Sequence, residues 1–303
     1  MIVPRIFIIP LLVMLIVSPL WAEEQKPLDE NLITDAIHQE QVNNESDNSA
    51  TDDNAHFQEL VQQAQAAYEK RQNLSSIQSC IELYRQALQL EQSDWQVNLE
   101  YAQAILWFQG YHGNKQNQNP KLMEEGIEAV DKALAVQPDN LLAHYVRGLL
   151  HGFYGQILDS LGSLEHFEIM ENELAWVEER DPAFDYGGIY RALGRYYSKL
   201  PGLLGGDEDK ALDYYNQARD ICPQYLLNDV LIAELYKSQD KVLEARELLQ
   251  PVLESGRPVD TELVPEWHMW QARARRAIDS LPSVVSQAPT ETNVNSNNGA
   301  SLN

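Results

Sequence analysis

Residues Asp181–Pro223 read DPAFDYGGIYRALGRYYSKLPGLLGGDEDKALDYYNQARDICP, and this stretch decides the predicted fold of the chain. It contains two segments with helical periodicity, separated by the glycine-rich segment Leu200–Gly206. In the second segment small residues flank an aromatic one, at Ala211, Tyr215 and Ala218, before the final proline. Small residues allow two helices to cross closely, a large one fills the space beside them, and proline ends a helix. We therefore expect a closely packed helix pair.

The spacing within this pair matches the tetratricopeptide repeat (TPR). The consensus positions of the first helix are occupied by Tyr190, Leu193, Gly194 and Tyr197, with tyrosine where tryptophan is usual. Ala211, Tyr215 and Ala218 take the consensus positions of the second helix. A single repeat cannot bury its apolar face alone, so the chain should contain neighbouring repeats.

The small–large–small pattern of the second helix recurs five times along the chain. The five sets are Cys80, Tyr84, Ala87; Gly126, Val130, Ala133; Met170, Leu174, Val177; Ala211, Tyr215, Ala218; and Ala245, Leu249, Val252. The last two sets are 34 residues apart, which is the TPR period, and the longer intervals elsewhere indicate insertions. The sequence thus predicts an all-α, TPR-like helical solenoid of degenerate helix-turn-helix repeats with disordered tails.

The first 22 residues are predicted to be a cleaved signal peptide. Arg5 precedes the apolar run Ile6–Val17, and Ala22 is the small residue required before a cleavage site. The run is short for a membrane span, although an uncleaved anchor stays open as an alternative. No cysteine lies near the cleavage site, so we do not expect a lipoprotein.

The remaining chain divides into three parts by composition. Residues 23–55 are rich in Glu, Asp, Asn and Gln and predict a disordered acidic linker. Residues 56–282 carry the helical periodicity and form the predicted solenoid domain. Residues 283–303 are polar without periodicity and predict a disordered tail.

Charge and cysteine content exclude several classes of function. The chain has 46 acidic and 22 basic residues, for a net charge of −24, which argues against binding to nucleic acid or anionic lipid. Only two cysteines are present, Cys80 and Cys222, so the chain has no disulfide framework of the small secreted type.

Catalytic motifs are missing from the sequence. It contains no His-Glu-x-x-His, no Gly-x-Ser-x-Gly and no Cys-x-x-Cys. His144 and His151 share a helical face but are about 10 Å apart by helix rise, too far to chelate one ion. We therefore expect no enzyme activity, no cofactor and no metal site.

The best cluster for ligand binding lies in the first helix of the best-preserved repeat. Arg191 and Arg195 are one helical turn apart and lie beside Tyr186 and Tyr190. Arginine binds carboxylates through two parallel hydrogen bonds, so this cluster is a candidate ligand or partner site. The alternative is that both arginines form salt bridges within this acidic protein.

The glycine-rich segment also offers two interpretations. It is not a phosphate site, because no Gly-Lys-Ser/Thr follows and Asp207 begins the next helix as an N-cap with two further acids. Leu203 and Leu204 either fold back over the helix pair or form a contact surface for a partner. A helical stripe of Gly148, Gly152 and Gly155 indicates either close helix packing or a cavity wall.

Several residue pairs in the opening stretch resemble the T-component family of TPR proteins associated with TRAP transporters (TatT). The most specific are Gly187-Gly188, Leu193-Gly194 and Pro201-x3-Gly205-Gly206-Asp207, and the likeness spans Leu142–Leu253. The resemblance implies an all-α fold of cryptic TPRs, a periplasmic location and docking to a periplasmic substrate-binding protein that feeds a secondary transporter. The sequence departs from the family in lacking a lipobox cysteine.

Two functions are compatible with these observations. The first is a non-catalytic periplasmic TPR adaptor that binds a protein partner, namely a substrate-binding protein of a TRAP-type transporter, and handles a small organic ligand. The alternative is a general cell-envelope scaffold that binds proteins or peptides without a transporter role. Formation of a homo-oligomer is left open by the sequence.

Overall fold

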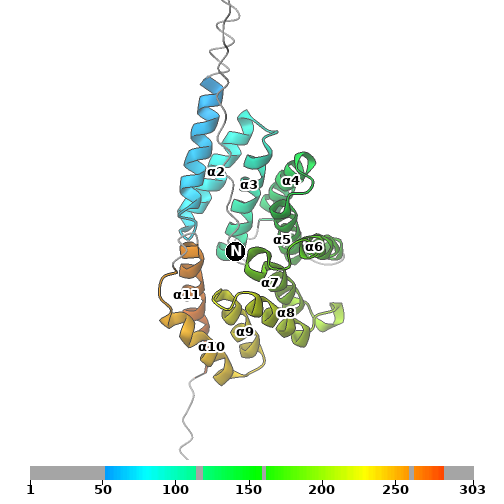
Figure 1. Cartoon of the computed structure of the whole chain (residues 1–303), viewed down its shortest axis with the longest axis vertical. Helices are drawn as coiled ribbons and strands as arrows, with labels where there is room; N and C mark the ends of the chain where they lie inside the picture. The colour runs from blue at the N-terminus through cyan, green and yellow to red at the C-terminus, as the bar shows by residue number, and fades with distance from the viewer. Residues whose placement is uncertain (1–51, 114–118, 159–161, 259–262, 283–303) are drawn as a thin grey trace, which may run out of the picture. The chain divides into compact units, whose positions relative to one another are not determined.

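The computed structural model describes residues 52–113, 119–158, 162–258 and 263–282, and within them the chain is helical without any strand (Figure 1). The predicted signal peptide, the acidic linker up to residue 51 and the C-terminal tail lie outside the described residues. Helix 52–68 already includes the last residues that the sequence assigned to the linker. The all-α, TPR-like solenoid predicted from the sequence is confirmed.

The helices follow one another in the order of the predicted repeats. After helix 52–68 come α2 (Leu74–Leu90), α3 (Trp95–Trp107), the π-helical turn η1 (Phe108–His112), α4 (Pro120–Val136), α5 (Leu141–Ile157), α6 (Gly162–Glu178), α7 (Phe184–Lys199), the 3-10 turn η2 (Gly202–Leu204), α8 (Glu208–Ile221), α9 (Leu227–Ser238), α10 (Val242–Glu254) and α11 (Val264–Asp279). In four pairs, α3 packs with α4, α5 with α6, α7 with α8 and α9 with α10, and α11 follows the last pair. The buried residues of helix 52–68 and α2 belong to one cluster, so these two helices form the first pair.

The five small–large–small sets lie on the second helix of each pair. These helices are α2, α4, α6, α8 and α10, and every position of the five sets is buried. The three innermost positions of α10, for example, are Ala245, Leu249 and Val252, each at most 1% exposed. The pattern therefore identified the side of each second helix that packs against the rest of the solenoid.

Side-chain caps explain where several helices begin. Asp94, Asn119, Asn140 and Asp207 each accept a hydrogen bond from the backbone N–H three residues later. Such a cap satisfies one of the N–H groups left without a partner in the first turn. Asp207 is the N-cap that the sequence predicted, and its carboxylate lies 2.9 Å from the nitrogen of Lys210.

The first helices of the pairs form a continuous row, here called the inner row. In this row α3 contacts α5, α5 contacts α7, α7 contacts α9 and α9 contacts α11. The second helix of each pair packs on the outer side of this row, as Figure 1 shows for α4, α6, α8 and α10. Side chains on the inner row therefore come from helices that are distant in the sequence.

The close approach of α5 and α6 explains the glycine stripe. A Cβ atom on Gly152 would lie 2.5 Å from the Sδ atom of Met170, and one on Gly155 would lie 2.9 Å from the ring of Phe167. Real Cβ atoms do not come so close to other atoms, so alanines at these positions would force the side chains of Met170 and Phe167 to shift. The close-packing interpretation of the stripe is confirmed.

The first helix pair also contacts the last helix. Arg71, in the turn between helix 52–68 and α2, donates two hydrogen bonds to the carboxylate of Glu266 on α11, at 2.8 and 2.9 Å. Met269 of α11 packs against the buried cluster of the first helix pairs. In Figure 1, α11 lies against the end of the first helix pair accordingly.

Neither cysteine forms a disulfide, since Cys80 and Cys222 are both free and buried. In the described part of the chain, no helix combines the length and the apolar character that crossing a membrane requires.

Candidate functional site

The inner row contains a left-handed turn at the beginning of α7. Asp185 (φ 49°, ψ 46°), Tyr186 (φ 55°, ψ 39°) and Gly187 (φ 81°, ψ 28°) are consecutive and all have positive φ. For residues with a Cβ this conformation costs about 1–2 kcal/mol each, so surrounding contacts must hold it. Strained backbone of this kind is concentrated at functional sites, which makes the turn the natural centre of the candidate site.

Arg191 holds the turn from one helical turn away. Its guanidinium donates to the carbonyl oxygens of Asp185 and Tyr186, at 2.5 and 2.6 Å, and to the Asp185 carboxylate at 2.9 Å. The guanidinium also lies 4.1 Å from the ring centroid of Tyr225. Because Nη1 and Nη2 make three hydrogen bonds within the chain, the salt-bridge interpretation describes Arg191 better than a ligand clamp does.

Tyr145 of α5 completes the network around Asp185. Its hydroxyl donates a hydrogen bond of 2.8 Å to the Asp185 carboxylate, which Arg191 also binds. Burial and the neighbouring negative charge raise the pKa of Tyr145 well above its usual value, so the phenol stays protonated and remains a donor. The network therefore joins α5 to the turn that begins α7.

The paired glycines that carried the family resemblance are required by this turn. Gly187 has a φ of 81°, and a Cβ atom on it would lie 3.0 Å from the Cα of Ala218. A Cβ atom on Gly188 would meet the Tyr145 hydroxyl at 2.2 Å. The Gly-Gly pair thus allows α8 on one side and Tyr145 on the other to approach the backbone.

The two tyrosines of the predicted cluster have separate neighbours. Tyr186 is 40% exposed and its ring stacks on Tyr225 at 5.3 Å between centroids. Tyr190 is buried, and its hydroxyl donates to Glu178 of α6 at 2.9 Å while its ring stacks on Tyr214. Of these two side chains, Tyr186 has the surface needed to contact another molecule.

Arg195 differs from Arg191 in its surroundings. Its guanidinium lies 5.0 Å from the ring centroid of Phe153 on α5, and the side chain is half-buried. Its Nε atom is buried and has no hydrogen-bond partner among the described residues. The two arginines that the sequence grouped together therefore do not share an acceptor in the structure.

Two ion pairs that the sequence did not indicate involve α11. Arg273 of α11 binds the carboxylate of Glu234 on α9 through two hydrogen bonds, at 2.5 and 2.6 Å. Arg71 and Glu266 form the second pair. Their partners are 39 and 195 residues apart, so no local spacing could have identified them.

The glycine-rich segment forms a tight, exposed loop. It is closed by hydrogen bonds from the N–H of Gly205 to Gly202 and from the N–H of Gly206 to Pro201, both 3.1 Å long. Leu203 is fully exposed, at 101%, so it does not fold back over the helix pair. Leu204 belongs to η2, and its side chain lies outside the described part of the structure.

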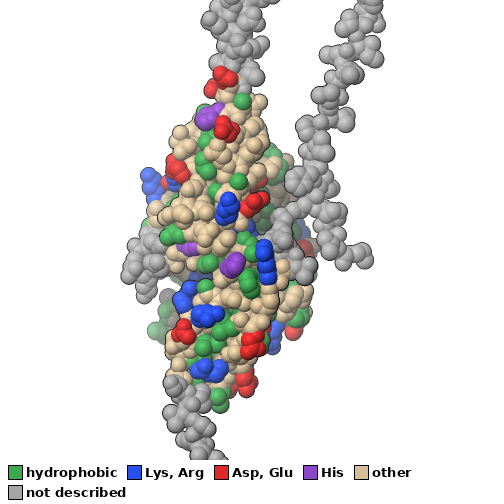
Figure 2. All heavy atoms as spheres, turned by 90° about the vertical axis from the view of Figure 1, so that its left-hand side faces the viewer, with side chains coloured by type: hydrophobic (Ala, Val, Ile, Leu, Met, Phe, Trp, Pro, Cys, Tyr) green, Lys and Arg blue, Asp and Glu red, His purple; other side chains and the backbone are tan. Residues whose placement is uncertain are grey.

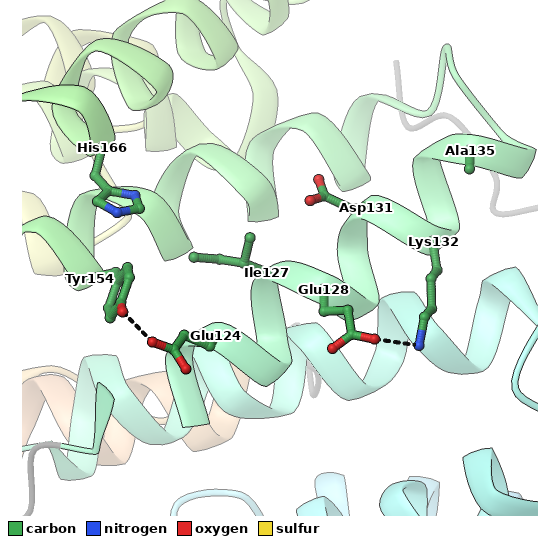
Figure 3. A pocket seen from close by; sticks show the side chains of 8 residues that line it. All are labelled: Glu124, Ile127, Glu128, Asp131, Lys132, Ala135, Tyr154 and His166. Carbon is green, nitrogen blue, oxygen red and sulfur yellow. Dashed lines mark hydrogen bonds and ion pairs between the residues drawn. The ribbon is translucent and has the colours of Figure 1, made fainter. Parts of the chain in front are cut away.

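A hollow of about 560 Å³ lies away from these residues, on α4, α5 and α6 (Figure 3). Its lining is Glu124, Ile127, Glu128, Asp131, Lys132, Ala135, Tyr154 and His166. The polar groups drawn as bonded in Figure 3 satisfy one another: Tyr154 donates to Glu124, and Lys132 pairs with Glu128 at 2.8 Å. None of the site residues predicted from the sequence lines this hollow.

The face shown in Figure 2 carries basic, acidic and apolar side chains interspersed, without a field of one kind. A binding surface for a polyanion would need clustered lysines and arginines, which this face does not present.

The strained turn, its glycine pair and the exposed loop all fall in the second half of the chain, where a known family matches. Residues 152–283 match the model of the TRAP transporter T-component family. The resemblance drawn from the sequence is thereby confirmed over this range. The matching segment contains the last six residues of α5 and all described helices from α6 to α11.

One solved structure supports the fold. A thermophilic TPR protein of Thermus thermophilus is 20% identical, with 73% of this chain and 98% of that chain covered and a TM-score of 0.52. Weaker similarity is found to MamA (14% identity, 67% and 97% covered, TM-score 0.40) and to PilF of Pseudomonas aeruginosa (16% identity, 75% and 89% covered, TM-score 0.40). A comparison with curated proteins found no match.

Proposed function

We propose that this protein is a non-catalytic periplasmic TPR adaptor that binds a substrate-binding protein of a TRAP-type transporter and handles a small organic ligand. The observation that carries the proposal is the match of residues 152–283 to the T-component family. The family is one of transporter components, and TPR-like solenoids commonly serve as extended surfaces for protein partners. The periplasmic location rests on the signal peptide predicted for residues 1–22.

The proposed contact surface for the protein partner is the loop around Leu203. A leucine that is fully exposed at a tight loop gains nothing from the folding of its own chain, whereas it can fill an apolar pocket on a partner. The loop lies within the segment that matches the T-component family. Tyr186 is the other exposed large side chain of the predicted cluster, and we include it in the proposed surface with Leu204.

The test is a crosslinking pull-down from intact periplasm with identification by mass spectrometry. We expect the unchanged protein to enrich a solute-binding protein, and Leu203→Ser to reduce the enrichment. Leu243→Ser is the matched control, because Leu243 is an exposed leucine (58%) on α10, outside the loop. Failure to enrich any solute-binding protein would contradict the adaptor function. Equal enrichment by the Leu203→Ser variant would remove the loop from the interface.

The alternative is a general cell-envelope scaffold. It is favoured by one observation, namely that helix 52–68 and α2 to α4 lie outside the segment that matches the T-component family. A scaffold would enrich envelope proteins that are unrelated to transport, and its gene would stand apart from transporter genes. The adaptor function would be favoured if the pull-down enriched a solute-binding protein and the gene stood beside transporter genes.

A further inference from the structure

Two hollows lie on either side of α4. The first is the hollow of about 560 Å³ on α4, α5 and α6 (Figure 3), here called the α4–α6 hollow. The second, the α2–α4 hollow, has a volume of about 400 Å³, and its lining includes Arg85 of α2, Asn98 of α3 and Glu125 of α4. Glu128 and Lys132 belong to both linings, so α4 forms a ridge between two neighbouring depressions.

The α4–α6 hollow has an apolar wall with acidic groups along it. Its α4 residues recur every three or four positions and so lie on one face of that helix. They are Glu124, Ile127, Glu128, Asp131, Lys132 and Ala135. Figure 3 shows Ile127 extending from α4 toward Tyr154 of α5 and His166 of α6. A side chain that is apolar along its stem and charged at its end fits such a wall.

Carboxylates outnumber lysines and arginines around the two hollows. Among the lining side chains and those ion-paired to them there are five carboxylates and three cations, namely Glu82, Glu124, Glu125, Glu128 and Asp131 with Arg85, Lys132 and Arg147. Arg147 also binds Glu173, and Lys121 acts on Glu125 from farther away, so the excess of carboxylates remains. Glu124 has no ion pair among the described residues and receives its hydrogen bond from the Tyr154 hydroxyl. The surface therefore suits a cation.

Asn98 adds an acceptor without a donor to the α2–α4 hollow. The residue is 1% exposed, and its amide nitrogen donates to the carbonyl oxygens of Gln92 and Asp94, at 2.9 and 2.8 Å. These two bonds use both hydrogens of the amide, and its Oδ1 atom has no hydrogen bond from the described residues. An amide oxygen buried without a donor costs free energy, and a peptide N–H or an ammonium entering the hollow would supply that donor.

We propose that the two hollows and the α4 ridge between them bind an extended, lysine-containing segment of a protein partner. The stem of a lysine lies along Ile127 and Tyr154, and its ammonium reaches Glu124. A main-chain N–H of the same segment donates to Oδ1 of Asn98 on the other side of the ridge. Both hollows must be occupied together, which favours a chain over a single small cation.

This surface is distinct from the one proposed for the transporter partner. Helices α2, α3 and α4 lie outside the segment that matches the T-component family, whereas the loop around Leu203 lies within it. A second copy of this chain does not suit the surface, because each copy has a net charge of −24 and the two would repel each other. The occupant is therefore a basic segment of another protein.

The test measures binding of an acetylated Lys-Ala-Lys-Ala-Lys peptide with a fluorescein label to the full mature chain by fluorescence anisotropy. The buffer contains about 150 mM salt, which screens attraction between charges that are more than about 8 Å apart. We expect the lysine peptide to bind and Glu-Ala-Glu-Ala-Glu, with the same label, not to bind. The unlabelled lysine peptide should compete better than spermidine, which has a similar positive charge but no peptide backbone.

Ala135→Trp fills the α4–α6 hollow without changing any charge. Ala135 is exposed in the lining, so the variant should fold, and we expect it to weaken peptide binding at least about fivefold, as the loss of one well-packed contact does. Ala175→Trp is the matched control, because Ala175 is an exposed alanine of α6 outside both linings. This control should bind the peptide like the unchanged protein.

Glu124→Gln tests the charge without altering the shape. Glutamine keeps an oxygen for the Tyr154 hydroxyl, and we expect peptide binding to weaken about two- to fivefold, the factor that a surface ion pair contributes. Glu168→Gln is the control, since it removes the same charge from an exposed position of α6 outside both linings. If a tryptophan variant does not fold, this pair of glutamine variants decides alone.

The proposed surface would be overturned by equal binding of the acidic peptide, or by equal effects of either variant and its control. Competition by spermidine as strong as that of the unlabelled peptide would overturn the protein segment as the occupant and leave a site for a free small cation. Leu203→Ser should bind the lysine peptide like the unchanged protein. Failure of the adaptor function and failure of this surface are therefore observed separately.

Discussion

Arg191 binds the side chain and the backbone carbonyl oxygen of Asp185, a residue that stands in a left-handed conformation six positions before it. The ion pair and the strained backbone therefore depend on each other. Without the guanidinium, the carbonyl oxygens of the turn would lose their donors, and the conformation would lose the contacts that offset its cost. Tyr145 adds a second donor to the same carboxylate, so the turn is fixed from α5 as well as from α7.

Tyr145→Phe should reveal how much the network stabilises the fold. The change removes only the hydroxyl that donates to Asp185, and hydrogen bonds to charged groups contribute about 1.5–3 kcal/mol. We expect the free energy of unfolding, measured with urea, to fall by about that amount. Tyr236→Phe is the control, because the hydroxyl of Tyr236 has no hydrogen bond in the described structure. Equal effects of the two changes would show that the network contributes nothing specific.

Three glycine substitutions separate backbone strain from steric overlap. Gly187→Ala combines a φ of 81° with a Cβ 3.0 Å from Ala218, and Gly205→Ala has a φ of 94° with open space around it. We expect Gly205→Ala to lower stability by about 1 kcal/mol through strain alone, and Gly187→Ala to lower it by more. Gly202→Ala, which has open space and no positive φ, should leave the urea midpoint nearly unchanged. If Gly205→Ala lowered stability more than Gly187→Ala, steric overlap with Ala218 would not add to the cost of the strained backbone.

The second helices could be predicted from the sequence because their burial follows a local rule. Each set spans two helical turns, so its spacing alone places its residues on one buried face, as for Ala245, Leu249 and Val252. The N-cap hydrogen bond at Asp207 is equally local, since the Asp207 carboxylate accepts it from the backbone N–H of Lys210, three residues later.

The inner row was not predictable in the same way. Glu266 and Arg71 are 195 residues apart, and their pairing depends on how the first and last helices meet. The positive φ of Asp185 and Tyr186 could not be inferred from residue type either, because contacts from Arg191 and Tyr145 impose it. The Gly-Gly pair marked the position of the turn in the sequence. Which residues pack against the turn depends on the fold.

Acid should destabilise the protein through His151. This buried histidine lies with its Nδ1 atom 2.7 Å from that of His166, and its pKa is lowered from 6.5 to about 4 because burial, His166 and Arg147 disfavour a positive charge. The unfolded chain therefore takes up a proton below pH 6.5 that the folded chain does not, until the pH reaches about 4. Stability should fall across this window, by about 3 kcal/mol at most.

His151→Gln checks the origin of this pH dependence. Glutamine cannot become charged, so the decrease in unfolding free energy between pH 6.5 and 4 should be smaller in this variant than in the unchanged protein. His268→Gln, at an exposed histidine, should retain the full decrease. If the His151 variant keeps the same slope as the control, another group causes the pH dependence.

Leu203→Ser should leave stability unchanged, although it replaces a large apolar side chain. The side chain is fully exposed, so the change removes no buried area and creates no cavity, and we expect a difference of at most about 0.5 kcal/mol in urea unfolding. Leu174→Ala is the contrasting case, because Leu174 is 0% exposed on α6 and such a change costs about 2–5 kcal/mol. A drop of similar size for Leu203→Ser would mean that the leucine belongs to the core, and the loop could then no longer serve as the contact surface for a partner.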